Sequence, residues 1–267
     1  MSHWHPMGSA EFIDQFPLYR VSSAGATDDV AALTVTAILQ TVPFLERLSL
    51  DLGHRKLPLV PAEHFAVNAA SQAAATSLKA LFDAHGSDKA NSHNYHHVYG
   101  SILQQPELVT GVFEIGLGTH HTDVVSNMGV HGRPGSSLRA FRDFLPNAQI
   151  YGADVDRRVL FTEDRIQTFF LDQTDLGAID TLSGQLDRQF DLVIDDGLHS
   201  PNANVAALVF GLRHVKPGGY FVVEDIAPSH FPVWQVVSAL LPANYQCTLV
   251  AAHAGCMCVM RKAVLPS

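Results

Sequence analysis

Cysteine is scarce in this sequence, and its placement excludes two kinds of protein. The three cysteines are Cys247, Cys256 and Cys258, all near the C-terminus. An odd number at one end is not the disulfide framework of a small secreted domain. A zinc site would need further clustered ligands beside these thiols, and the sequence places none there. We therefore expect reduced, buried thiols and a cytoplasmic protein.

Positive charge and long apolar runs are also lacking. Lysine and arginine number 17 against 26 acidic residues, which gives a net charge of −9. Because nucleic-acid phosphates require a basic face, we expect no nucleic-acid partner. No apolar run reaches the roughly 18–20 residues that span a bilayer, and the N-terminus lacks the basic start and apolar stretch of a signal peptide. We expect no membrane association.

The length and composition favour one α/β domain with an extension. The 267 residues are 47% hydrophobic and 16% charged, which is enough apolar material for a sizeable core. Residues 1–12 read as a vector-derived leader and are excluded from functional argument. Residues 13–85 are predicted to form a helical extension, with Leu57 to Pro61 breaking the helical pattern. We expect this extension to cap a site or to form the interface of a homo-oligomer, and residues 86–267 to form the main domain.

The pattern from Val109 onward predicts strands that alternate with helices. The central strands are almost entirely apolar, which indicates a parallel sheet covered by helices on both faces. The last two strands are predicted to pair antiparallel around His253, Ala254 and Gly255. The predicted strands are 112–115, 150–154, 166–171, 190–195, 220–224, 245–252 and 256–261.

Acidic residues stand where several of these strands end. In a doubly wound sheet, ligands bind at the carboxyl ends of the strands. Each acid alone is explained better by helix capping or a loop position than by ligand binding, but acids at successive strand ends favour one shared site. The acids are Glu114, Asp154, Asp156, Asp172, Asp195, Asp196, Glu224 and Asp225.

The first strand runs into a glycine turn, Gly116-Leu117-Gly118, whose context argues against a dinucleotide. The dinucleotide fingerprint needs a third glycine and an acid about 20 residues further on. Histidines follow Gly118 in place of that glycine, and Asp154 lies much farther away. Glu114 beside the turn suits a ligand with a cationic amino-acid end, and the later acid suits a ribose diol. S-adenosylmethionine carries both.

These motifs together carry a family resemblance over roughly residues 80 to 262. They resemble class I S-adenosylmethionine-dependent methyltransferases, and are most similar to the metal-dependent sugar O-methyltransferases of macrolide and enediyne antibiotic biosynthesis. The resemblance implies an α/β fold, a Rossmann-like seven-stranded sheet with an N-terminal helical extension. The motifs are 114–119 (EIGLGT), the strand ending at Asp154, 125–129 (VSNMG) with 133–139 (RPGSSLR), 195–199 (DDGLH), 218–226 (GGYFVVEDI), and 86–89 (GSDK) with Tyr95 and Tyr99.

The resemblance also implies roles for individual residues. Asp196, Glu224 and Asp225 would hold Mg²⁺ or another divalent cation, and His199 would be the general base. The chemistry supports these roles separately, because magnesium prefers hard oxygen ligands, a metal-bound hydroxyl is more acidic, and imidazole accepts protons near neutral pH. A cofactor-binding role is also expected for Lys89, Tyr95 and Tyr99, although a solvated loop explains these three almost as well. The residues expected to bind S-adenosylmethionine are Glu114, Gly116, Gly118, Ser126, Asn127, Asp154, Asp172, Gln173, Asp195, Lys89, Tyr95 and Tyr99.

The reaction implied is methyl transfer to a sugar hydroxyl of a glycosylated natural product or glycan, a small-molecule partner. A catechol-like aromatic is an alternative acceptor, since two neighbouring ring oxygens could bind the same metal. A non-catalytic subunit that only binds S-adenosylmethionine is a second alternative, and the intact set of acids with His199 counts against it. Nicotinamide-dependent oxidoreduction is disfavoured by the missing third glycine.

Overall fold

The computed structural model of the chain describes the backbone of residues 27–265 and the side chains of residues 32–265. Residues 1–12, predicted to be a vector-derived leader, lie outside the described residues. The chain divides into two compact units. One contains helix α2 together with residues 232–240, and the other runs over residues 57–231 and continues from residue 241.

Helices α2 and α3 lie in the extension that the sequence predicts to be helical, and residues 57–61 separate them. Helix α3 begins with a capping box, in which Asn68 and Ser71 each bind the other's backbone amide. The α-helices are α2 (Thr27–Asp51), α3 (Ala69–His85), α4 (His96–Ile102), α5 (Ser136–Phe144), α6 (Leu176–Gln185), α7 (Pro201–His214) and α8 (Phe231–Leu240). Short 3₁₀ turns are η1 (Ala62–His64), η2 (Pro106–Leu108), η3 (Arg157–Val159) and η4 (Pro228–His230).

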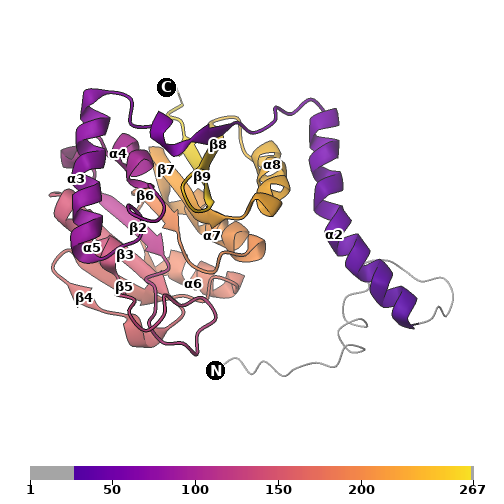
Figure 1. Ribbon diagram of the computed structural model, residues 1–267, viewed down its shortest axis with the longest axis horizontal. Coiled ribbons are helices and arrows are strands. Elements are labelled where there is room, and N and C mark those ends of the chain that lie inside the picture. The colour runs from indigo at the N-terminus through magenta and orange to yellow at the C-terminus, as the bar shows by residue number, and fades with distance from the viewer. Residues whose placement is uncertain (1–26, 266–267) are drawn as a thin grey trace. The chain divides into compact units, whose positions relative to one another are not determined.

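The strands form one nine-stranded sheet in the order β1-β8-β9-β7-β6-β2-β3-β5-β4 (Figure 1). The neighbours from β7 through β6, β2 and β3 to β5 are parallel, whereas β9 runs antiparallel to both β7 and β8. The seven predicted strands are confirmed, and two short edge strands, β1 and β4, are added to them. The strands are β1 (Leu59–Pro61), β2 (Gly111–Ile115), β3 (Gln149–Asp154), β4 (Thr162–Glu163), β5 (Ile166–Phe170), β6 (Phe190–Asp195), β7 (Val215–Ile226), β8 (Tyr245–Ala251) and β9 (Cys256–Lys262).

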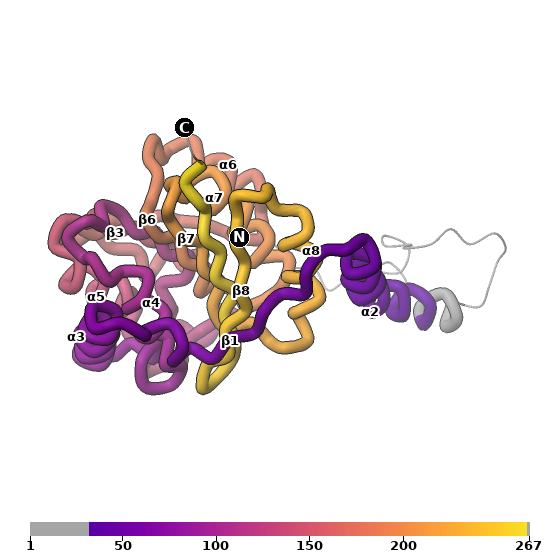
Figure 2. Tube along the Cα trace, turned by 90° about the horizontal axis from the view of Figure 1, so that it is seen from above, coloured from indigo at the N-terminus to yellow at the C-terminus, as the bar shows by residue number. Residues whose placement is uncertain are grey.

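Helices cover both faces of this sheet, as the apolar central strands predict (Figure 2). Strand β2 is buried throughout, and its successive side chains point alternately to the helices on one face of the sheet and to the helices on the other. Phe113 packs against Phe210 of α7 with ring centroids 4.6 Å apart. Val112 belongs instead to the core that includes Phe82 of α3 and Phe141 of α5. Glu114, two residues after Val112, therefore faces the layer formed by α3, α4 and α5.

Phe82 is central to that layer, and its loss should destabilise the unit strongly. Its side chain is fully buried and meets the rings of Tyr99 and Phe141 edge-on at 6.4 and 5.4 Å. Phe82→Ala is expected to lower the free energy of unfolding by about 3–5 kcal/mol, because it leaves a cavity among packed rings. Denaturant unfolding measures this. Leu108→Ala is the control, since Leu108 is 68% exposed; an equal loss in both variants would contradict the assignment of this core.

The smaller unit holds a long helix with a proline inside it, Pro43. Arg47 and Asp51 form an ion pair one helical turn apart, with Nε 2.9 Å from Oδ1. The side-chain amide of Gln235 donates to the carbonyl of Arg55 at 3.0 Å, which joins the two segments of this unit. Among residues 27–265, no helix has both the length and the hydropathy that a membrane span requires.

Candidate active site

The carboxyl ends of β2, β3, β6 and β7 meet at one edge of the sheet. Ile115 pairs with both Ala153 and Asp195, and Asp195 pairs with Val223. Because these partners are in register, the residues that follow them leave the sheet side by side. The predicted convergence of Gly116, Asp196 and Glu224 at this edge is therefore present.

The glycine turn after β2 lies against the loop that carries Asp196. Gly116 has φ of +94°, and a Cβ built there would lie 2.0 Å from the carbonyl oxygen of Asp196. Gly118 has φ of +71°, and its missing side chain leaves room for the sulfur of Met128. Only glycine fits both the backbone conformation and the close approach at position 116.

Glu114 and Asp154 flank this turn and already have partners in the chain. Glu114 is fully buried, accepts a hydrogen bond from Ser137 Oγ at 2.7 Å, and has Oε1 3.1 Å from the Lys89 ammonium. Burial raises the pKa of Glu114. Asp154 accepts from the backbone amides of Leu117 and Asp156, both at 2.8 Å, so that its carboxylate fastens the end of β3 to the glycine turn. Burial raises the pKa of Asp154 as well.

Asp195 and Gln173 build the turn that follows β6. Asp195 is fully buried and accepts from the amides of Gln173 and Asn204 at 3.0 and 2.8 Å. Gln173 in turn accepts from the backbone amide of Leu198 at 2.8 Å. Asp172 caps its own turn by accepting from Thr174 N at 2.9 Å. These predicted cofactor residues are thus tied to the chain in this structure, and their contact with a cofactor stays a prediction.

The loop between β2 and α5 reaches the same turn. Ser126 Oγ donates to the carbonyl of Gly197 at 3.1 Å. Its neighbour Asn127 is exposed and accepts from Gly129 N at 3.0 Å, which shapes the loop itself. Of this predicted pair, Ser126 is therefore the residue that joins the loop to the turn carrying Asp196 and His199.

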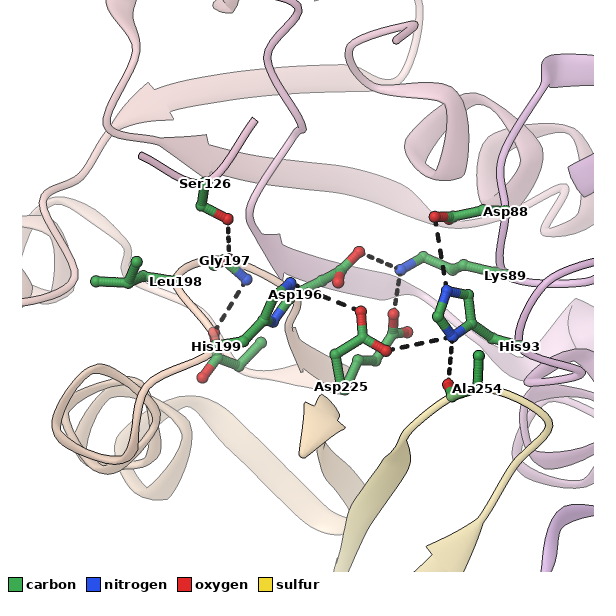
Figure 3. A network of polar contacts seen from close by, with 12 residues as sticks. Asp88, Lys89, His93, Ser126, Asp196, Gly197, Leu198, His199, Asp225 and Ala254 are labelled. Carbon is green, nitrogen blue, oxygen red and sulfur yellow. Dashed lines mark hydrogen bonds and ion pairs between the residues drawn. The ribbon is translucent and has the colours of Figure 1, made fainter. Parts of the chain in front are cut away.

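Asp196, His199 and Asp225 form a group that could hold a metal ion. Each offers one ligand atom, and these atoms lie within 4.8 Å of one another. His199 Nε2 lies 3.6 Å from Asp225 Oδ2. Figure 3 shows Asp225 lying between the imidazoles of His199 and His93. Asp225 adopts φ of +54°, a strained conformation for a residue other than glycine, and such residues concentrate at functional sites.

The third predicted metal ligand, Glu224, is buried and does not belong to this group. Its Oε2 lies 2.6 Å from Lys89 Nζ, and its Oε1 accepts a short hydrogen bond from the Tyr99 hydroxyl. Burial, followed by the negative charge of Asp196, raises the pKa of Glu224 well above its usual value. The donor set at the exposed side of the site is therefore two carboxylates and an imidazole, whereas both carboxylate oxygens of Glu224 are bound by Lys89 and Tyr99.

Lys89 is a buried cation among these acids. Its ammonium lies 2.5 Å from Asp196 Oδ2, 2.6 Å from Glu224 Oε2 and 3.1 Å from Glu114 Oε1. Burial alone would lower the pKa of Lys89, but the charges of Asp196, Glu114 and Glu224 raise it well above the ordinary value. Lys89 therefore joins the carboxylate beside the glycine turn to those at the ends of β6 and β7.

Tyr95 and His93 approach Asp225 from the same segment. Tyr95 Oη donates to Asp225 Oδ1 at 2.5 Å. His93 Nδ1 lies 2.6 Å from the carbonyl of Ala254 and 3.3 Å from Asp225 Oδ1. His93 is a site residue that the sequence does not predict, because it meets Asp225 and Ala254 across more than 130 residues. Its place in a polar segment next to Tyr95 was the one available signal.

Comparisons with known proteins give sequence relatives, although no family model matches the chain. The chain is 31% identical over 67% of its length to the 8-demethyl-8-alpha-L-rhamnosyl tetracenomycin-C 2'-O-methyltransferase of Streptomyces olivaceus. It is 40% identical over 37% of its length to the mycinamicin VI 2''-O-methyltransferase of Micromonospora griseorubida. These matches cover 45% and 24% of the two relatives, so the chain spans less than half of either.

A solved structure shares the fold. MycE methyltransferase from the mycinamycin pathway, in a complex with Mg, SAH and mycinamycin VI, superposes with a TM-score of 0.56 over 72% of this chain and 57% of that one. The sequence identity of 24% makes this a likeness of fold alone. The fold of the chain is that of the class I methyltransferases. In sequence, the chain is related to the sugar O-methyltransferases of glycosylated antibiotics.

Proposed function

We propose that the chain is an S-adenosylmethionine-dependent, divalent-metal-dependent O-methyltransferase that acts on a sugar hydroxyl of a glycosylated small molecule. The observation that carries this proposal is the group of Asp196, His199 and Asp225, within 4.8 Å of one another, beside the glycine turn of a methyltransferase fold. The acceptor class rests on the relatives, which are named for O-methyl transfer to a rhamnosyl tetracenomycin and to mycinamicin VI.

The site has the parts that such a transfer needs. The acceptor oxygen forms a bond to the methyl carbon while the carbon–sulfur bond breaks, and S-adenosylhomocysteine leaves. His199 Nε2 accepts the hydroxyl proton, with Asp225 Oδ2 at 3.6 Å to stabilise the resulting imidazolium. Much of the rate enhancement comes from holding the acceptor and the donor in line.

The donor set fits a divalent cation. Asp196 and Asp225 offer carboxylate oxygens at the exposed side, which suits a hard ion such as Mg²⁺. Such an ion, when bound, would supply positive charge that makes the acceptor hydroxyl more acidic. The chain's own contribution is to hold the carboxylates in place and to keep an imidazole within reach of the proton.

Metal dependence is the first test of this function. Methyl transfer from labelled S-adenosylmethionine to a panel of glycosylated polyketides is expected to fall to background in excess chelator and to return when Mg²⁺ is restored. The reason is that the acceptor hydroxyl would lose the charge that acidifies it. Calorimetry with S-adenosylhomocysteine is the control and should show donor-side binding in both conditions. Full turnover in chelator would contradict the metal half of the proposal.

The cellular setting follows from the same proposal. The cysteines Cys247, Cys256 and Cys258 are all free thiols, which supports a reducing, cytoplasmic location.

The helical extension is proposed to contribute a cap or an interface between copies. A small-molecule acceptor is consistent with the acidic net charge of −9.

A further inference from the structure

We infer that Tyr95 is a positioning residue for the divalent cation, acting by fixing the carboxylate of Asp225, rather than a contact for the methionine end of the cofactor. This inference rests on the proposed function, because it requires a cation held by Asp225. It assigns Tyr95 a role different from the one that the sequence suggests.

The phenol of Tyr95 holds both the side chain and the backbone of Asp225. Its oxygen donates to Asp225 Oδ1 at 2.5 Å and accepts from the backbone amide of Asp225 at 3.3 Å. Tyr95 is fully buried, so these contacts do not compete with water. Asp225 needs such support because its φ of +54° costs free energy that surrounding contacts must offset.

The contacts divide the two oxygens of Asp225 between different neighbours. Oδ1 faces the buried side, where it meets Tyr95 and, at 3.3 Å, Nδ1 of His93. Oδ2 faces His199 Nε2 at 3.6 Å, within the group that could hold a cation. A ligating carboxylate whose other oxygen is hydrogen-bonded presents its free oxygen in one direction, and such supporting contacts tune metal affinity.

Asp196 shows the same arrangement with a different donor. Its Oδ2 lies 2.5 Å from the ammonium of Lys89, which is also fully buried. Two residues from one short segment, Lys89 and Tyr95, therefore each hold one oxygen of one carboxylate of the proposed metal site. The arrangement explains why the segment between α3 and α4 is buried against the ends of β6 and β7.

The hydroxyl of Tyr95 is fully used by Asp225. It donates to Oδ1 of the carboxylate, which as an ionised group can only accept, and it accepts from the backbone amide of the same residue. Since Tyr95 has a single polar side-chain atom and this atom is committed to Asp225, little remains for a cofactor.

The space around the hydroxyl is also closed by the β8–β9 hairpin. A Cβ built at Gly255 would lie 3.3 Å from Asp225 Oδ1 and 3.5 Å from Tyr95 Oη. Asn94 adds a second contact by accepting from the backbone amide of His253 at 3.0 Å. The hairpin tip thus covers the Tyr95–Asp225 pair on one side.

Tyr95→Phe tests the inference with no change of charge and little change of volume. Binding of Mn²⁺ alone, followed by electron paramagnetic resonance, is expected to weaken about 10- to 100-fold, the usual effect of losing a supporting contact to a metal ligand. S-adenosylhomocysteine affinity by calorimetry should stay unchanged. Tyr151→Phe is the matched control, since its hydroxyl lies 2.9 Å from Arg188 Nη1, away from the carboxylate group, and should leave Mn²⁺ affinity unchanged.

A double-mutant cycle with Asp225→Asn shows whether Tyr95 acts through Asp225. Once Asp225→Asn has lowered Mn²⁺ affinity, adding Tyr95→Phe is expected to lower it no further. Additive losses would overturn the inference, because they would mean two independent effects. If Tyr95→Phe lowers the melting temperature so far that the protein is partly unfolded during the Mn²⁺ titration, the weaker binding reflects lost structure. That outcome would also overturn the inference, in favour of a structural role for Tyr95.

The remaining outcomes separate this inference from the proposed function. If the unmodified protein binds Mn²⁺ and Tyr95→Phe binds it equally well, the inference fails and the proposed metal site stands. Unchanged Mn²⁺ affinity with weaker S-adenosylhomocysteine binding would return Tyr95 to the cofactor. If the unmodified protein binds no Mn²⁺, the metal half of the proposed function fails and the inference fails with it.

Discussion

Replacing His199 by alanine is expected to lower kcat for methyl transfer by about 10²- to 10⁴-fold, the ordinary range for a positioned general base. The imidazole is more than one-third exposed and lies 3.6 Å from Asp225 Oδ2, where an acceptor hydroxyl can reach it. Because the proton is accepted during the reaction, acceptor binding and S-adenosylhomocysteine binding should change little. Steady-state kinetics together with calorimetry separates these effects.

Two controls make the His199 result specific. His54→Ala removes an exposed histidine of the smaller unit and should leave kcat unchanged. Mn²⁺ binding to His199→Ala then distinguishes the base from a metal ligand, since His199 belongs to the group within 4.8 Å. Retained Mn²⁺ affinity with lost turnover supports the base. Unchanged turnover would make the residue structural, and loss of Mn²⁺ would assign it to the metal.

Gly116→Ala is expected to disrupt the proposed metal site by displacing the backbone of the loop that carries Asp196. A side chain at φ of +94° is strained, and its Cβ would lie 2.0 Å from the Asp196 carbonyl oxygen. The strain and the overpacking cost about 1–3 kcal/mol each. The Asp196 loop must move to relieve the contact, so both the free energy of unfolding and Mn²⁺ affinity should fall. Denaturant unfolding and Mn²⁺ titration measure the two losses.

Gly129→Ala is the matched control for this prediction. Gly129 also has a positive φ, +72°, but nothing lies within 4 Å of a Cβ built there. It should therefore carry the backbone strain alone and leave Mn²⁺ affinity intact. Equal effects of the two substitutions on Mn²⁺ affinity would show that the close approach of the glycine turn to Asp196 has no importance for the site.

The sequence predicted seven of the strands because they are short segments bounded by turn residues, and those at the centre of the sheet are almost entirely apolar. It predicted the converging acids because parallel strands end at one edge of the sheet. The edge strands β1 and β4 escaped prediction because segments of 3 and 2 residues carry no periodic pattern. Their strand conformation depends on pairing with β8 and β5.

The hydrogen-bond partners of the site residues could not be read from the sequence. Lys89 meets Asp196 and Glu224 across 107 and 135 residues, and such distances leave no local pattern. Asp195 resembles its neighbour Asp196 in sequence, yet it is fully buried, with Gln173 and Asn204 as donors. Alternation along β6 explains this, because neighbouring residues at a strand end face different surroundings.

Locating the transferred methyl group distinguishes methylation of a sugar hydroxyl from methylation of the aglycone. The protein is incubated with methyl-labelled S-adenosylmethionine, Mg²⁺ and a rhamnosylated polyketide, and the same aglycone without sugar is incubated in parallel. After acid hydrolysis of the product, the account predicts label in the released sugar and no labelled product from the aglycone alone. Label in the aglycone, or equal labelling with and without the sugar, would contradict a sugar O-methyltransferase.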